Sequence, residues 1–152
     1  MRRAVLLHAL LPLALAAAPA SAASLRSCDT FEAGAQFLIL PADEGVRSYA
    51  NGAISLLHLD TDGEPACCSS HLLVRHPDPS APFQACTLIS HEGEMGFQWL
   101  FLSEAEARYD PATGLSVGSP AFLYGETAPR PARLTITVNQ AQGTVRAENA
   151  LR

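Results

Sequence analysis

The chain has 152 residues, enough for one domain with its own hydrophobic core. Its ten basic residues are all arginines and stand against fifteen acidic ones, which gives a formal net charge of −5 at pH 7. Nucleic acids and anionic membrane surfaces bind basic patches, so this composition argues against both as partners.

The N-terminus has the three parts of a secretory signal peptide. Arg2 and Arg3 form a basic start, residues 4–18 are apolar except for one histidine and one proline, and Ala20-Ser21-Ala22 has the small-x-small pattern of a cleavage site. The apolar run is shorter than the about 20 residues that cross a bilayer, so a transmembrane anchor is disfavoured. We predict a signal peptide at residues 1–22 and one exported β-rich domain at residues 23–152, with no membrane span after cleavage.

Export determines the expected state of the cysteines. The alanine-rich leader and the absence of lysine are typical of a GC-rich bacterial genome, so we expect the mature protein in the bacterial periplasm or outside the cell. Both compartments are oxidising. The four cysteines, Cys28, Cys67, Cys68 and Cys86, are therefore expected to form two disulfide bonds.

Short strands separated by turns make up the first half of the mature sequence. Proline, glycine, asparagine and aspartate cluster at residues 51–52, 60–65 and 76–82, which marks these segments as turns. Between the turns, apolar residues predict strands at residues 36–40, 53–59, 67–75 and 83–90.

An aromatic segment begins the second half. Residues 97–102 predict a strand on which Phe97, Trp99 and Phe101 share one face, and we interpret this face as core rather than as a ligand platform. Residues 104–108 contain good helix formers but are few, so they form either a single helical turn or an edge strand.

The C-terminus gives the clearest pattern. Apolar and polar residues alternate over residues 134–139, and a turn leads into residues 144–148, which predicts a β-hairpin with one buried face. A further strand is expected at residues 115–125, after the turn at residues 110–114. Together these elements predict a mainly β fold, a small antiparallel sandwich or meander barrel of roughly eight short strands, stapled by two disulfides.

The cysteine pairing depends on the strand expected at residues 67–75. Successive side chains of a strand point to opposite faces, so Cys67 and Cys68 should each take a separate partner. Two pairings satisfy this condition and both stay open: Cys28–Cys67 with Cys68–Cys86, and Cys28–Cys68 with Cys67–Cys86. A bond between the two neighbours, with Cys28–Cys86 as the second bond, needs a strained ring and is the least favourable of the three.

A metal site is the first alternative to two disulfides. Cys68 and His71 could bind copper or zinc together with His76, His91 or Cys67, since a sheet can gather residues from distant strands. The spacing argues against a structural zinc site, because no second cysteine pair accompanies Cys67 and Cys68. We therefore predict no resident metal and no cofactor, with periplasmic copper or zinc binding as the alternative.

A small serine hydrolase is the second alternative. Residues 114–118 read G-L-S-V-G and match the G-x-S-x-G pattern, which in α/β-hydrolases places a nucleophilic serine between a strand and a helix. The triad histidine follows the serine in those enzymes, whereas the last histidine of this chain, His91, precedes Ser116. We expect a glycine-flanked turn and strand at Ser116 and no catalytic residue.

The sequence thus predicts a non-catalytic binding or structural module of the bacterial envelope rather than an enzyme. Its partner would be another envelope protein or a small ligand. Binding residues concentrate on loops, so the candidate contact surfaces are the loops and acidic turns at residues 60–64, 77–82, 92–94 and 127–131.

Overall fold

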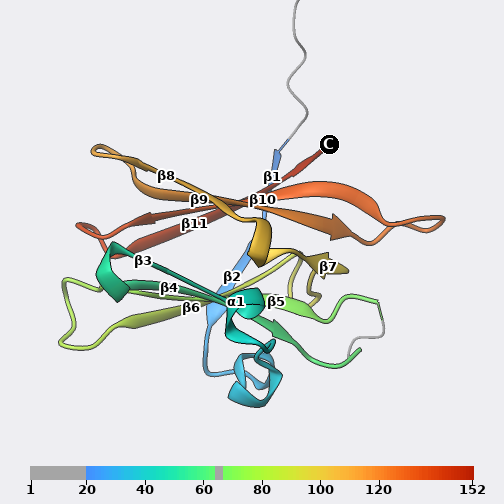
Figure 1. Cartoon of the computed structure of the whole chain (residues 1–152), viewed down its shortest axis with the longest axis horizontal. Coiled ribbons are helices and arrows are strands. Elements are labelled where there is room, and N and C mark those ends of the chain that lie inside the picture. Colours follow the sequence, from blue (N-terminus) through green and yellow to red (C-terminus); the bar gives the residue numbers. More distant parts are fainter. Residues whose placement is uncertain (1–19, 64–66) are drawn as a thin grey trace, which may run out of the picture.

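The computed structural model describes residues 20–63 and 67–152. Two antiparallel β-sheets lie face to face and form an open sandwich (Figure 1), so the predicted mainly β class is confirmed. The sheets contain six and five strands, more than the roughly eight strands expected in all. The predicted signal peptide lies outside the described residues apart from its last three, and so do residues 64–66 of the turn before the cysteine pair.

The first sheet, called the C-terminal sheet below, contains six strands. Five of them lie in the order β1 (Ala20–Ala22), β11 (Thr144–Leu151), β10 (Arg130–Asn139), β9 (Gly114–Leu123) and β7 (Trp99–Leu100). The sixth, β8 (Glu106–Asp110), also pairs with β9 and is exposed along its whole length, so residues 106–108 lie in an edge strand, whereas Glu104 ends a 3-10 turn.

The second sheet, called the N-terminal sheet, contains five strands. They lie in the order β2 (Ser24–Ser27), β6 (Ala85–Ser90), β5 (Ser70–His76), β4 (Ile54–Asp60) and β3 (Val46–Tyr49). Helical structure in the described residues is limited to short turns: α1 (Ala42–Gly45) and four 3-10 turns, η1 (Phe31–Ala33), η2 (Ala35–Phe37), η3 (Ala50–Gly52) and η4 (Leu102–Glu104). The chain enters through β1 in one sheet and passes directly to β2 in the other.

The predicted C-terminal hairpin is confirmed, and its alternation builds one wall of the core. Leu134, Ile136 and Val138 of β10 are fully buried, while the residues between them are partly exposed. Ile136 lies opposite Val117 of β9 and opposite Ala147 of β11. Period-two alternation therefore gives the C-terminal sheet one apolar face and one polar face.

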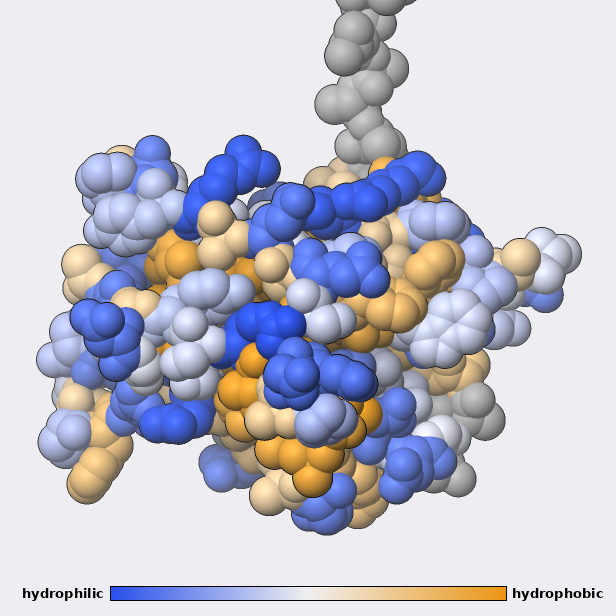
Figure 2. Space-filling model, in the orientation of Figure 1, coloured by the Kyte–Doolittle hydropathy of each residue, from blue (hydrophilic) through white to orange (hydrophobic). Residues whose placement is uncertain are grey.

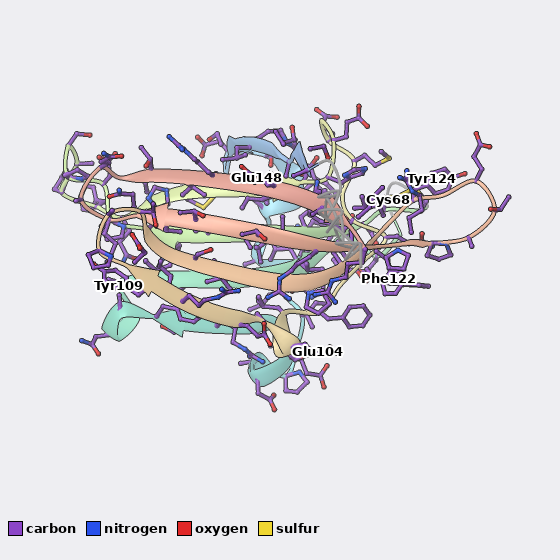
Figure 3. All side chains as sticks on the ribbon, turned by 90° about the horizontal axis from the view of Figure 1, so that it is seen from above. Cys68, Glu104, Tyr109, Phe122, Tyr124 and Glu148 are labelled. Carbon is purple, nitrogen blue, oxygen red and sulfur yellow. A yellow bond between two sulfur atoms is a disulfide. The ribbon has the colours of Figure 1, made fainter. Side chains whose placement is uncertain are left out.

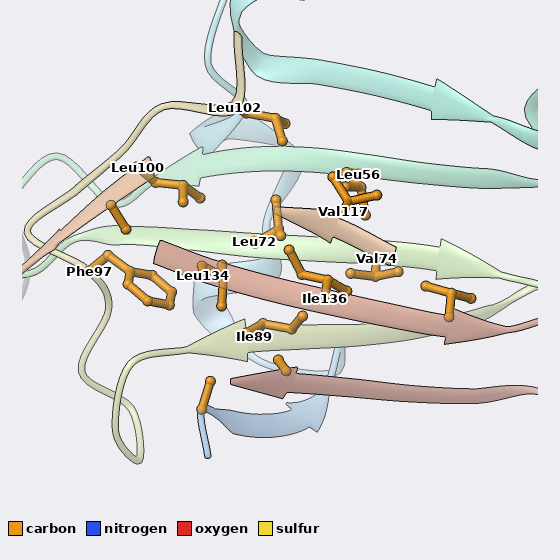
Figure 4. Packing of buried hydrophobic residues seen from close by; sticks show 14 of the residues in the cluster. Leu56, Leu72, Val74, Ile89, Phe97, Leu100, Leu102, Val117, Leu134 and Ile136 are labelled. Carbon is orange, nitrogen blue, oxygen red and sulfur yellow. The ribbon is translucent and has the colours of Figure 1, made fainter. Parts of the chain in front are cut away.

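The core fills the space between the two sheets (Figure 4). Leu72 and Val74 of β5 pack in one cluster with Leu134 and Ile136 of β10, and all four side chains are fully buried. Burying one such side chain contributes about 1.5–3 kcal/mol, so this contact between the sheets is the main stabilising term in the domain.

The predicted strand at residues 36–40 is wrong. This segment forms the 3-10 turn η2, and only Leu38 makes an isolated bridge, to Leu59. Phe31 and Phe37 pack edge to face with ring centres 4.9 Å apart, so the segment folds on itself and covers one end of the outer face of β4.

The predicted common face of the aromatic residues is also wrong. Phe97 is fully buried and bridges Ser70 of the N-terminal sheet, whereas Trp99 is 49% exposed and pairs with Phe122 of the C-terminal sheet. The chain changes sheets between these two residues. Alternation along one strand therefore does not connect them, and Trp99 lies against Phe122 on the outer face.

Both favoured cysteine pairings are wrong. Cys28 is bonded to Cys86, with their Cα atoms 5.8 Å apart, and Cys67 is bonded to Cys68. The register of β2 and β6 brings the first pair together, because Ser27 lies opposite Thr87. β5 begins only at Ser70, so the neighbouring cysteines precede the strand and the alternation argument does not apply to them.

Apolar residues gather at the lower centre of the face shown in Figure 2, over the segment that leads into α1. The large apolar side chains most exposed in this segment are Phe31 (68%) and Leu40 (72%). The rest of this face is mixed, with hydrophilic residues prominent along the C-terminal sheet.

We expect the two disulfides to contribute very differently to stability. Replacing Cys28 and Cys86 with serine releases residues separated by 58 positions and should lower the free energy of unfolding by about 4 kcal/mol. Replacing Cys67 and Cys68 opens no long loop and should cost well under that. Urea unfolding of the two double variants compares them directly, and equal losses would contradict this expectation.

Candidate functional site

A pocket of about 270 Å³ opens at the end of the sandwich where the β9–β10 hairpin turns. We call it the end pocket. Its walls are Ala20, Ser21, His91, Leu123, Arg130, Asn149 and Leu151. Figure 3 shows Tyr124, the neighbour of Leu123, at this end of the molecule and Tyr109 at the opposite end.

Asn149 is the buried polar residue of the end pocket. It lies opposite Leu134 on β10 and opposite Ser21 on β1, and only 2% of its surface is exposed. Its Nδ2 donates a hydrogen bond of 3.3 Å to Nδ1 of His91, which joins the two sheets. Its Oδ1 accepts no hydrogen bond from any described residue. A buried carbonyl without a donor costs about 1–3 kcal/mol, so this position is costly to the fold.

His91 and Arg130 determine the charge of the end pocket. Burial lowers the pKa of His91 below its ordinary value; the neighbouring carboxylate of Glu92 opposes this shift and the guanidinium of Arg130 adds to it. His91 is therefore neutral at pH 7, in agreement with its Nδ1 accepting the amide hydrogen of Asn149. Arg130 is the permanent cation on the pocket wall.

The composition of the end pocket suits binding rather than bond breaking. Leu123 and Leu151 supply apolar walls and the guanidinium of Arg130 offers donors, while Asn149 also lines the pocket and has a buried Oδ1 that lacks a donor among the described residues. Ligand pockets commonly combine apolar walls with a few polar groups that fix orientation. A group that both donates and accepts hydrogen bonds, such as a peptide unit, matches these polar atoms.

Two of the four predicted contact surfaces adjoin the end pocket. Arg130 belongs to the segment at residues 127–131, and His91 precedes the acidic turn at residues 92–94. The segment at residues 77–82 instead lines a separate hollow of about 240 Å³. The turn at residues 60–64 is described only as far as Gly63.

The four candidate metal ligands lie in different surroundings. His71 is fully buried and its Nδ1 is hydrogen-bonded to the Ser90 hydroxyl at 2.9 Å. His76, at the end of β5, is bonded through Nε2 to Thr87 Oγ1 at 3.2 Å, and His91 lies in the end pocket. Cys68 is bonded to Cys67. Residues 20–63 and 67–152 contain no group of three or more histidine, cysteine or acidic residues that could hold a metal ion.

Ser116 lies inside an uninterrupted strand, as expected. β9 runs from Gly114 to Leu123, so no strand-to-helix turn presents the serine. Its partners in the sheet are Thr137 on β10 and Arg108 on β8.

A chain of polar groups lies beside His71. The Ser90 hydroxyl accepts a hydrogen bond of 3.1 Å from Nη2 of Arg26, and the same nitrogen donates to Glu32 at 3.2 Å. The chain connects η1 to β2, β6 and β5, and the Cys28–Cys86 bond anchors the same segment. It therefore holds the N-terminal segment against the sheet.

Sequence reasoning missed Asn149, although one signal for it was present. Residues 145, 147, 149 and 151 occupy one face of β11, where the others are valine, alanine and leucine. A polar residue on an apolar face departs from the strand pattern, and such departures often mark functional positions. The predicted strand ended at residue 148, one residue too early to include it.

We expect stability to fall as the pH drops below about 6.5, the ordinary pKa of histidine. Burial lowers the pKa values of His58, His71 and His91, so in this range the unfolded chain binds more protons than the folded chain. Urea unfolding at pH 7.5, 6.0 and 5.0 measures the loss, which His71→Asn should reduce. Stability that is constant or rising toward pH 5 would contradict this expectation.

Comparisons of the chain with protein-family models, with curated proteins and with solved structures found no match.

Proposed function

We propose that this chain is an exported protein of the bacterial envelope that binds a ligand non-catalytically in the end pocket. The N-terminal sequence supports export, and two bonded cysteine pairs suit an oxidising compartment. None of the helices in the described part of the chain has the length and apolar character to cross a membrane.

Asn149 carries the binding proposal. It places an amide on the buried face of β11, with its Oδ1 facing no donor among the described residues, although an apolar side chain would pack there at no such cost. Proteins keep a costly polar group on an apolar face where function requires it. A ligand that donates a hydrogen bond to this carbonyl would offset the cost.

The other two hypotheses receive less support. Metal binding through Cys68 would first require reduction of the Cys67–Cys68 bond, because the metal ligand is the thiolate. Hydrolysis at Ser116 would require a base, and the strand neighbours of that serine are Thr137 and Arg108. The end pocket is the better-supported site.

Export and disulfide formation can be tested together on the protein that a bacterial host secretes. Protein secreted from a bacterial host should begin at Ala23, contain no free thiol and weigh four protons less than the reduced mature chain. Elemental analysis should find no stoichiometric copper or zinc. Two free thiols with one bound metal ion would favour the metal hypothesis, and an uncleaved leader would overturn the proposal of a secreted domain.

Replacing Asn149 should stabilise the fold. We expect Asn149→Leu to raise the free energy of unfolding by about 1 kcal/mol, because it removes a buried carbonyl that has no donor. The matched control is Asn139→Leu, which should lower stability because Oδ1 of Asn139 accepts the Gln142 N–H at 3.1 Å. Urea unfolding measures both. Equal losses in the two variants would remove the argument that Asn149 is kept for binding.

A further inference from the structure

We propose that removal of the leader opens the edge of β11, and that the mature protein binds an extended segment of a partner polypeptide there as an added antiparallel strand. This inference rests on the proposed function, because it requires export with cleavage after Ala22, and it names the ligand class of the end pocket.

The pairing of β1 with β11 shows that the edge of β11 accepts an antiparallel strand. Its three residues pair with β11 in antiparallel register, with Ala20 opposite Ala150, Ser21 opposite Asn149 and Ala22 opposite Glu148. These three residues are also the predicted cleavage motif. Cleavage after Ala22 therefore removes all of β1 and leaves this part of β11 without a neighbour.

The rest of the acceptor edge stays in place after cleavage. The nitrogen of Ala23 donates a hydrogen bond of 3.0 Å to the carbonyl of Ala147, and Ala23 is buried in the core. Figure 3 shows Glu148 on β11, just beyond this anchor point. An unpaired strand edge is a ready template for an added strand, and such addition is an established mode of peptide recognition.

The end pocket would supply specificity. Ala20 and Ser21 form part of its wall, so loss of β1 opens the pocket toward the bare edge while Arg130, His91 and Asn149 remain. An added strand in the same register would place its central residue where Ser21 now lies, opposite Asn149. Alternate side chains of a strand point to opposite faces, so this central side chain would enter the pocket.

Arg130 predicts the charge of that side chain. It is the cation on the pocket wall, and the wall contains no acidic residue. Glu92 lies close enough to act on His91, but it is not part of the wall. A partner segment with a central glutamate should therefore bind more tightly than one with a central lysine.

A second copy of the chain is a weaker candidate for this edge. Two copies could pair only through the three residues of β11 that β1 covers, because Ala23 keeps the carbonyl of Ala147 occupied in each copy. A peptide makes the same pairing and also fills the pocket with a side chain. The partner segment is thus the occupant that the geometry favours.

The test titrates mature protein, beginning at Ala23, with the capped peptide Ala-Pro-Ala-Ser-Ala, which is the sequence of residues 18–22. Saturable binding should shift the backbone amide resonances of residues 148–151 and the side-chain amide of Asn149. A chain beginning at Pro19 keeps β1 and should not bind. Binding elsewhere on the protein would overturn the inference.

Two further peptides test the side-chain preference. In one peptide glutamate replaces the central serine and in the other lysine does, and the glutamate peptide should bind about two- to fivefold more tightly than the lysine peptide, the range of a solvent-accessible ion pair. Arg130→Gln should abolish this preference, so that the glutamate and lysine peptides bind that variant equally. Arg108→Gln, on the exposed strand β8, is the matched control and should leave the preference unchanged.

A peptide methylated on its central nitrogen separates strand addition from simple pocket filling. Hydrogen-bonded pairs alternate along antiparallel strands, and Ala23 bonds Ala147, so the next such pair should be the central residue with Asn149. The methylated peptide should therefore lose binding.

Equal binding of the methylated and unmethylated peptides would overturn strand addition and leave the proposed binding function intact. Dimers of the mature protein in the absence of peptide would assign the edge to a second copy. If none of the peptides binds and the capped amino acid N-acetylalaninamide does not bind either, both this inference and the proposed binding function fail.

Discussion

The contact between the inner faces of the two sheets is the constraint on which the rest of the structure depends. Leu72 and Val74 on one side and Leu134 and Ile136 on the other are fully buried, and they fix how the sheets lie relative to each other. Neither sheet could bury these side chains alone. Strand alternation turns these apolar residues inward, and the end pocket opens where the packed faces end.

The end pocket arises where that packing stops. Toward the end of the sandwich Asn149 interrupts the apolar side chains of β11, and it faces His91, which directly follows β6 of the N-terminal sheet. Their hydrogen bond joins the sheets through polar atoms instead of through apolar contact. The fold gives up some stability at this point, which is where we propose that a ligand binds.

Fold class and the longer strands could be predicted from the sequence because they depend on local alternation. The C-terminal hairpin is the clearest case, since every second residue from Leu134 to Val138 is buried. The predicted pairing of Cys67 and Cys68 with separate partners was wrong because β5 begins two residues after the pair, so the two cysteines do not alternate along a strand. The prediction that Trp99 shares a face with Phe97 was wrong because the chain changes sheets between the two residues. The end pocket combines residues from β1, β9, β10, β11 and the turn after β6, and no local pattern brings such distant segments together.

The position of the Cys28–Cys86 bond has a consequence for the order of assembly. A secreted chain crosses the membrane from its N-terminus, and both cysteines precede every residue of β7 to β11. If the chain is exported as we propose, oxidation can therefore close the N-terminal sheet while the C-terminal strands are still on the cytoplasmic side. The covalently closed sheet would then serve as a template onto which the later strands condense as they emerge.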